Sequence, residues 1–249
     1  RNKKEVLTEL PDKIEQNIIL PFNDEEEKLY VANLAEANKE LQELYDLEGS
    51  DKMQILKLLT RLRQLCLEPR LVYDDIDQPS SKLKACMELI KTMQENKQKV
   101  LLFSSFTSVL DLIAEECQKA GITYYMLTGS TNKEDRRELV SRFQKDDTTV
   151  FLISLKAGGT GLNLTSAEAV IHFDPWWNVS AQNQATDRAY RIGQKNNVQV
   201  FNLVMKDSVE EKIIELQKRK KELADMFVEN NSGGLSQMSK EDILSLFTM

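Results

Sequence analysis

The chain has 249 residues, of which 41% are hydrophobic and 29% are charged, and its formal net charge is −7 at pH 7. This length is enough for one large or two small domains with buried cores. The longest apolar runs are too short to span a bilayer and the first residues form no signal-like segment, so we expect an intracellular protein with no membrane partner. The acidic balance argues against indiscriminate nucleic-acid binding, but a local basic track can still bind phosphate.

The cysteines and the single histidine argue against a metal site. Cys66, Cys86 and Cys117 lie far apart in the sequence without a C-x-x-C pair, and His172 is the only histidine. Zinc ligation is therefore not expected, and we predict no metal ligands. The cysteines are predicted to be buried thiols. His172 lies inside an apolar strand pattern, which predicts a core histidine with satisfied polar atoms.

The first part of the chain has a helical pattern. Asn23 is a suitable N-cap, and Glu26 follows it at capping-box spacing. Gly49 is expected to end this helix, and apolar residues at helical spacing over residues 55–66 predict a second one. The polar linker at residues 74–81 contains Pro79 and predicts a boundary. We place an interlobe segment at 1–22 and a helical insertion at 23–79.

The central part alternates short apolar strands with helices. Helical patterns begin near Ser81, Phe106, Asn132 and Asn178, and strands are predicted at residues 100–104, 123–127, 149–153, 169–173 and 198–204. Near-continuous apolar strands separated by helices predict an α/β domain over residues 80–205, with a parallel sheet covered on both faces. Function is then expected in the loops after the carboxyl ends of the strands, at residues 104–105, 128–130, 154–161 and 174–177.

The last part, residues 206–249, begins with a charged helix whose apolar residues form one packing stripe. Residues 230–234 break that helix. A short helix over 239–247 closes the chain, with Ser239 and Asp242 at capping-box spacing.

Two segments carry the chemistry. Arg188 and Arg191 are three residues apart at the end of a glutamine-led helical pattern, so we expect both guanidinium groups on nearly the same helix face. Such a pair can stabilise charge on a γ-phosphate, although a salt-bridged surface helix has the same spacing. The glycine-rich loop at 155–166 can hold a phosphate, but the chain contains no G-x-x-x-x-G-K-[ST] sequence. The residues therefore indicate half of a nucleotide site.

Four segments resemble helicase motifs of superfamily two in the form carried by the Swi/Snf-type remodelling ATPases. They are KVLLFSSFTSVLDLI, LTGSTNKEDRRELVSRF, LISLKAGGTGLNLTSAEAVIHFDPWWNVS and QATDRAYRIGQ. The resemblance covers nearly the whole chain and implies a RecA-like C-terminal lobe with an N-terminal helical insertion and a C-terminal brace helix. Thr128 and Val179 depart from the residues that relatives often carry, aspartate and proline, which affects only fine DNA contacts.

The resemblance implies an ATP-driven motor that translocates along double-stranded DNA. Carried over by position, Arg188, Arg191 and Gln184 are the catalytic candidates, with Gly159, Gly161 and Asp187 near the nucleotide. ATP with Mg²⁺ is expected to be bound mainly by an N-terminal RecA-like lobe of the same protein. The DNA-contacting candidates lie in the loops after the strands and are Ser105, Phe106, Gly129, Ser130, Arg136, Lys156, Thr160 and Trp177.

Several of these residues have a plainer interpretation. Trp177 can stack at the minor groove, but it can also be a core or hinge tryptophan, which is what we expect of Trp176. Arg136 and Arg137 can equally form a solvated helix face.

Two other functions remain open from the sequence. The chain can be a non-catalytic module whose helices dock partner proteins, although its intact arginine pair favours the motor. An RNA helicase is disfavoured by the D-R-A-Y-R-I-G-Q form. We expect a monomeric chain that neither hydrolyses ATP nor translocates alone, with a bacterial cytoplasmic location favoured over a nuclear one.

Overall fold

The computed structural model describes residues 11–46, 52–158, 162–226 and 240–248. They form two compact units. The first contains the described residues up to Ile18 and Ala85–Leu203, and the second contains Ile19–Lys84 and the described residues from Val204 onward. The boundaries predicted at 22, 79 and 205 stay predictions. No described helix combines the length and the apolar character that crossing a membrane requires.

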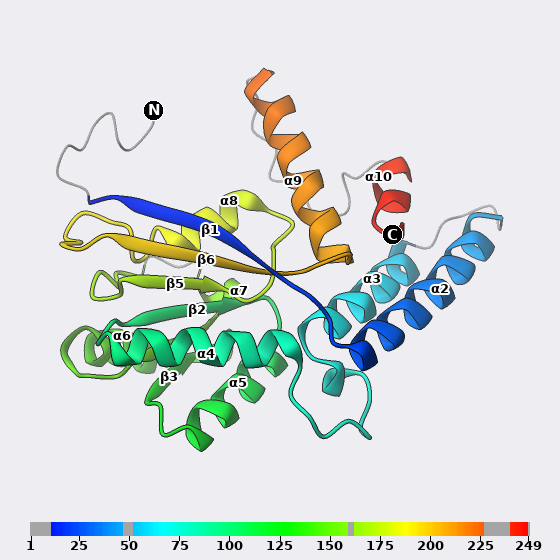
Figure 1. Cartoon of the computed structure of the whole chain (residues 1–249). Helices are drawn as coiled ribbons and strands as arrows, with labels where there is room; N and C mark the ends of the chain where they lie inside the picture. Colours follow the sequence, from blue (N-terminus) through cyan, green and yellow to red (C-terminus); the bar gives the residue numbers. More distant parts are fainter. Residues whose placement is uncertain (1–10, 47–51, 159–161, 227–239, 249) are drawn as a thin grey trace. The chain divides into compact units, whose positions relative to one another are not determined.

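The first unit is built on one six-stranded sheet, visible in Figure 1. Its spatial order is β1-β6-β5-β2-β4-β3, and the pairs β6–β5, β5–β2, β2–β4 and β4–β3 are parallel. The strands are β1 (Lys13–Leu20), β2 (Val100–Ser104), β3 (Tyr124–Leu127), β4 (Val150–Ser154), β5 (Ala169–His172) and β6 (Val198–Met205). The parallel sheet and all five predicted strands are confirmed, with ends shifted by one residue at β3, β4, β5 and β6.

The sixth strand, β1, is not among the predicted strands. Its sequence KIEQNIIL mixes polar and apolar residues, and all eight of them are exposed or half-buried. It lies at the edge of the sheet, beside β6. An edge strand needs no continuous apolar run, which is why a search for such runs misses it.

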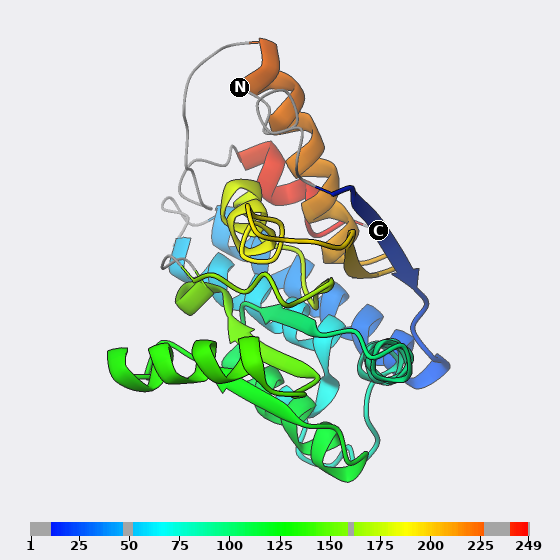
Figure 2. The ribbon, with the colours of Figure 1, turned by 90° about the vertical axis from the view of Figure 1, so that its left-hand side faces the viewer.

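Five helices are associated with the sheet. They are α4 (Ser81–Glu95), α5 (Thr107–Lys119), α6 (Lys133–Lys145), α7 (Leu155–Gly158) and α8 (Val179–Thr186). Asn132 and Asn178 cap α6 and α8, because each side-chain oxygen accepts a backbone N–H of the first turn. Figure 1 shows α4 and α5 on the face of the sheet nearest the viewer. Figure 2 gives the same ribbon turned by 90°.

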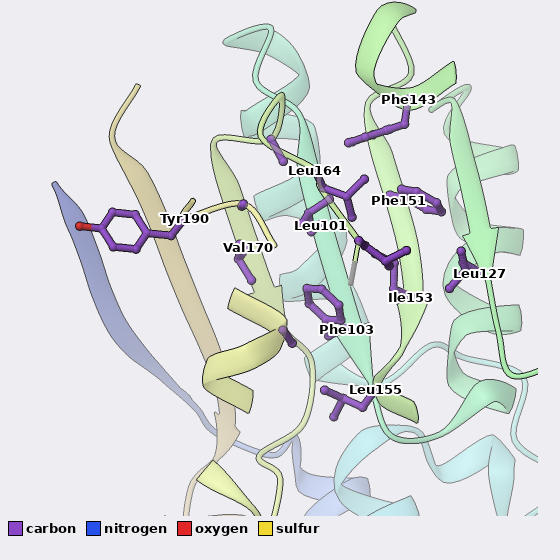
Figure 3. Close-up of a cluster of buried hydrophobic side chains, with 14 of the residues drawn as sticks. Leu101, Phe103, Leu127, Phe143, Phe151, Ile153, Leu155, Leu164, Val170 and Tyr190 are labelled. Carbon is purple, nitrogen blue, oxygen red and sulfur yellow. The ribbon is translucent and has the colours of Figure 1, made fainter. Parts of the chain in front are cut away.

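The other face of the sheet carries a buried apolar cluster (Figure 3). Leu101 and Phe103 of β2 and Phe151 and Ile153 of β4 point to this face, since alternate residues of a strand share a side. Phe143 of α6 packs on Phe151 with ring centroids 5.2 Å apart. The cluster fixes α6, α7 and α8 against the sheet, and thereby the loops that join them to the strands.

The second unit is mainly helical. It contains α2 (Asp24–Asp46), α3 (Lys52–Leu67), the 3-10 helix η1 (Pro69–Leu71), α9 (Val209–Met226) and α10 (Lys240–Ser245). The capping box at the start of α2 is confirmed: the Glu26 N–H donates to Asn23 Oδ1 at 2.9 Å, and the Asn23 N–H donates to Glu26 Oε2 at 3.1 Å. Gly49 and Ser239 lie outside the described residues.

A buried ion pair joins two segments of this unit that are distant in sequence. Lys82 Nζ lies 2.6 and 2.7 Å from the two carboxylate oxygens of Glu210, and their side chains are 0% and 1% exposed. The Met205 N–H also donates to Glu210, at 2.8 Å. All three cysteines are buried thiols, as predicted, and burial raises the pKa of the Cys66 thiol.

Candidate functional site

The loops after β2 and β5 are joined by one buried carboxylate. Asp174 accepts hydrogen bonds from Ser104 Oγ at 2.7 Å, from the Ser105 N–H at 3.0 Å and from Ser105 Oγ. The Phe106 N–H donates to Ser104 Oγ at 3.1 Å, and both Ser105 and Phe106 are half-buried. Sequence reasoning missed Asp174, because its partners lie about 70 positions away. The D-P-W-W sequence after an apolar strand was the available signal.

The turn after β3 presents small polar groups to solvent. Gly129 and Ser130 are exposed, and the Thr128 and Ser130 hydroxyl oxygens lie 2.8 Å apart. A Cβ added at Gly129 would meet no atom within 4 Å. The described fold therefore does not itself require glycine at this position.

A basic groove of about 750 Å³ lies at the start of α6. We call it the α6 groove. Arg136 also donates to the Ala157 carbonyl oxygen, at 3.4 Å. Among the described residues that line the α6 groove, three carry a positive charge and none carries a negative one. The lining residues are Thr131, Lys133, Arg136, Arg137, Val140, Leu162 and Asn163. The groove therefore suits an anion.

The glycine-rich segment is only partly described. Gly159, Thr160 and Gly161 lie outside the described residues. Residues Leu155–Gly158 form the short helix α7, which corrects the expectation of a loop directly after β4. Lys156 is exposed on this helix.

The two arginines do not lie on a helix. Helix α8 ends at Thr186, with Asp187 as its C-cap, and Arg188 and Arg191 occupy the turns that follow. The expectation of a shared helix face is therefore wrong. The physical reason is Gln194: its Nε2 donates to the carbonyl oxygens of Ala189 at 3.2 Å and Ala167 at 2.8 Å, which holds the chain in a folded turn.

This segment, residues 187–194, is called the arginine turn below. Gln184 and Arg191 are exposed, whereas Asp187 and Arg188 are half-buried. Burial lowers the pKa of the Arg188 guanidinium, and the positive charge of Arg191 lowers it further, while Asp187 opposes the shift. The Arg188 carbonyl oxygen accepts the Leu164 N–H at 3.0 Å, which ties the arginine turn to the segment after the glycines. The charges of the two arginine side chains therefore influence each other.

The two tryptophans after β5 differ in their contacts with the apolar cluster. Trp176 is half-buried and packs against the apolar cluster, as expected of a core tryptophan. Trp177 is also half-buried, and its role stays a prediction.

His172 is a core histidine with one unsatisfied nitrogen. It is 1% exposed, its Nε2 lies 2.9 Å from Thr186 Oγ1, and its ring stacks on Phe103 at 5.6 Å. Its Nδ1 has no hydrogen-bond partner among the described residues. The expectation of full satisfaction is therefore half correct.

We expect His172 to make the stability of the chain depend on pH. Burial lowers its pKa to about 4; Lys13 adds to this, while Glu15 and Asp174 oppose it. An unfolded histidine has a pKa of about 6.5. Between these values the unfolded chain binds a proton that the folded chain does not, so stability falls as pH drops from 6.5 to 4, by about 3 kcal/mol in total.

The measurement is thermal unfolding from pH 7 to 4.5, with His172→Gln as comparison. No other histidine titrates in this range. The wild-type unfolding temperature should fall more steeply than that of the variant. Parallel curves would show that His172 is readily protonated in the folded state.

Comparisons with known proteins come from sequence and from structure. A family model described as SNF2-related domain matches residues 1–71, and one described as helicase conserved C-terminal domain matches residues 81–193. An uncharacterized ATP-dependent helicase of Mycoplasma pneumoniae is 38% identical over 248 residues, covering 99% of this chain and 24% of that protein. The chain therefore spans about a quarter of the length of this curated relative.

Two solved structures of Sulfolobus solfataricus are similar. Its SWI2/SNF2 ATPase C-terminal domain has a TM-score of 0.75 and 27% identity, covering 94% of this chain and 98% of that chain. Its SWI2/SNF2 ATPase core in complex with dsDNA has a TM-score of 0.77 and 30% identity, covering 95% of this chain and 50% of that chain.

Proposed function

Because the chain belongs to the Snf2-type ATPases of helicase superfamily two, as their C-terminal RecA-like lobe, we propose that it is the second motor lobe of an ATP-driven translocase on double-stranded DNA. The observation that carries this proposal is the arginine turn, which follows α8 and in which the positive charge of Arg191 acts on the Arg188 guanidinium group. A translocase on double-stranded DNA would be located with the chromosome, in a nucleoid or a nucleus.

The donor groups of the arginine turn fit a nucleotide phosphate. The two positively charged guanidinium groups repel each other, and an anion placed between them would reduce this repulsion. Each group can also donate two parallel hydrogen bonds to phosphate oxygens. Gln184 adds an exposed amide from the last turns of α8. ATP with Mg²⁺, held mainly by a first lobe, would supply the phosphoryl group whose hydrolysis drives the motor.

Arg188 and Arg191 stabilise the charge that develops on the transferred phosphoryl group. Gln184 orients the γ-phosphate, and Asp187, Gly159 and Gly161 lie along the nucleotide. The chain itself contains no P-loop sequence. We therefore infer that turnover requires the first lobe and that this chain alone is inactive.

DNA is proposed to lie against the loops after β2, β3 and β4 and along the α6 groove. Backbone N–H groups, hydroxyl groups and cations suit phosphate contacts, which position a protein without reading sequence. Gly129 supports this because the described fold leaves space where its side chain would be. The proposed contacts are Ser105, Phe106, Gly129, Ser130, Arg136, Lys156, Thr160 and Trp177.

The DNA part of the proposal is tested by Arg136→Gln. If Arg136 neutralises one phosphate, the variant should bind duplex DNA more weakly, and the slope of log affinity against log salt should become shallower by about 1. The measurement is a salt titration of duplex binding by a protein that contains both lobes. Single-stranded DNA and duplex RNA serve as comparison ligands.

Arg142→Gln is the matched control, because Arg142 lies on the same helix but pairs with Glu138 outside the groove. It should leave the salt slope unchanged. Equal slopes for wild type and Arg136→Gln would remove Arg136 from the DNA surface. Tighter binding to duplex RNA than to duplex DNA would contradict a DNA motor.

A further inference from the structure

One row of register partners across the sheet is apolar on β4 and β2 and polar on β5 and β6. In the parallel register Ile153 pairs with Phe103, Phe103 with His172, and His172 with Asn202. Register partners point to the same face of a sheet. The side chains of His172 and Asn202 therefore lie side by side on the face that carries the apolar cluster.

Helix α8 meets these two polar side chains with two of its own. Gln182 and Thr186 are four residues apart and share a helix face. Gln182 Nε2 donates to Asn202 Oδ1 at 3.0 Å, and Thr186 Oγ1 lies 2.9 Å from His172 Nε2. Gln182 also accepts the Trp176 N–H, at 3.2 Å. Strand β5 therefore contacts α8 at Thr186, and strand β6 contacts it at Gln182.

The chain of contacts continues into the edge strand. Asn202 Nδ2 donates to Glu15 Oε1 at 3.2 Å and to Asn17 Oδ1 at 2.9 Å, and both acceptors belong to β1. A set of polar side chains therefore links α8 to the sheet: Asn202 of β6 connects β1 to Gln182, and His172 of β5 bonds to Thr186, the last residue of the helix. We call it the α8 anchor, and its members are Glu15, Asn17, His172, Gln182, Thr186 and Asn202.

Thr186 connects this network to the arginine turn. Its side chain bonds to the sheet, while its carbonyl oxygen accepts the N–H groups of Ala189 and Tyr190, both at 3.1 Å. These two N–H groups belong to the residues that lie between Arg188 and Arg191. A shift of Thr186 therefore shifts the turn that carries both guanidinium groups.

Apolar packing alone does little to hold α8. The helix has only 8 residues, and its buried residues are Ala185 and Thr186, which offer a single apolar methyl-sized side chain and a hydroxyl-bearing one. Helices this short are marginal without tertiary contacts. Directed hydrogen bonds from the sheet are consequently what fixes its rotation and position.

The unsatisfied nitrogen of His172 fits this interpretation. A buried polar atom without a partner costs stability, so an apolar residue would suit the core better. The hydrogen bond of His172 to Thr186 gives the ring a function that an apolar side chain cannot perform.

We propose that Gln182, Thr186, His172 and Asn202 are positioning residues, which hold the arginine turn in the geometry required for phosphoryl transfer and connect it to strand β1. The proposal rests on the proposed function of Arg188 and Arg191. It concerns residues other than those proposed to contact nucleotide or DNA, and it assigns their effect to the placement of the guanidinium groups.

The test uses a protein that contains both lobes and compares Thr186→Val with Thr186→Ser. Valine keeps the shape and removes the hydroxyl group, whereas serine retains it. Because misplacement of a catalytic group by about 1 Å can cost about 100-fold, we expect Thr186→Val to lower kcat by at least about 10-fold. The KM for ATP and the affinity for duplex DNA should stay within about 2-fold, and Thr186→Ser should restore most of kcat.

A second measurement does not depend on activity. In hydrogen–deuterium exchange the backbone N–H groups of residues 187–194 should exchange faster in Thr186→Val, while those of β2 and β4 should not change. Thr149→Val is the matched control, because Thr149 is a buried threonine at the amino end of β4, away from the site. It should change neither kcat nor exchange in the arginine turn.

The outcomes separate the two proposals. Unchanged kcat and unchanged exchange in Thr186→Val would overturn the α8 anchor. Faster exchange in a protein whose wild type shows no DNA-stimulated turnover would support the anchor and contradict the motor. If Thr186→Val does not fold, Gln182→Met removes the second contact of the helix and gives the same readouts with the same expectations.

Discussion

Replacing Arg188 with alanine in a protein that contains both lobes is expected to lower ATP turnover on the order of 10³-fold or more. Arg188 is half-buried, and the charges of Arg191 and Asp187 act on its guanidinium group. A positioned guanidinium group opposes the charge that develops on the phosphoryl group without reorganising during the reaction. The measurement is steady-state ATP turnover with and without saturating duplex DNA.

Arg188→Lys and Arg142→Ala sharpen this test. Lysine keeps the charge but not the planar pair of donors, so it should recover only a small part of the turnover. Arg142 is an exposed arginine of α6, paired with Glu138, and its replacement should leave turnover unchanged. Duplex binding should be the same in all three variants. If Arg188→Ala retains DNA-stimulated turnover within a few-fold of wild type, Arg188 is not an arginine finger.

Replacing Glu210 with alanine is expected to destabilise the second unit by about 3–5 kcal/mol. The replacement would leave the Lys82 ammonium group, whose side chain is 0% exposed, without its carboxylate partner. It would also remove the acceptor of the Met205 N–H. Chemical denaturation followed by circular dichroism measures the loss.

The double variant Lys82→Met with Glu210→Gln distinguishes a buried charge from lost packing. It contains neither charge, and glutamine still offers an oxygen to the Met205 N–H, so most of the lost stability should return. The exposed pair of Lys91 and Glu88 is the control, since Glu88→Ala should change stability by less than about 1 kcal/mol. A double variant as unstable as Glu210→Ala would show that the pair contributes mainly through packing.

The sequence predicts the parts of this fold that depend on local pattern. Continuous apolar runs locate β2 to β6, and Asn23, Asn132 and Asn178 are recognisable as N-caps because capping partners lie within three residues. Strand β1 escapes the same reasoning, because its place at the edge leaves polar side chains exposed.

The sequence predicts which residues make up the site better than it predicts the backbone conformation that holds them. The identity of Arg188 and Arg191 is plain in the sequence, but the end of α8 at Thr186 depends on contacts that Gln194 makes with Ala167, 27 positions away. Local spacing continues the helix there. The D-P-W-W sequence marks Asp174, but its partners Ser104 and Ser105 lie about 70 positions away, so the joining of the two loops depends on the fold.

The polar row under α8 also bears on how the strands find their alignment. Strands β5 and β6 are buried almost throughout, so apolar content alone distinguishes poorly between a correct pairing and one shifted by a residue. A shift by one residue would turn His172 or Asn202 toward the opposite face, away from Thr186 and Gln182. The hydrogen bonds that hold α8 are therefore lost in a misaligned pairing, so they favour the native register of β5 and β6 over shifted alternatives.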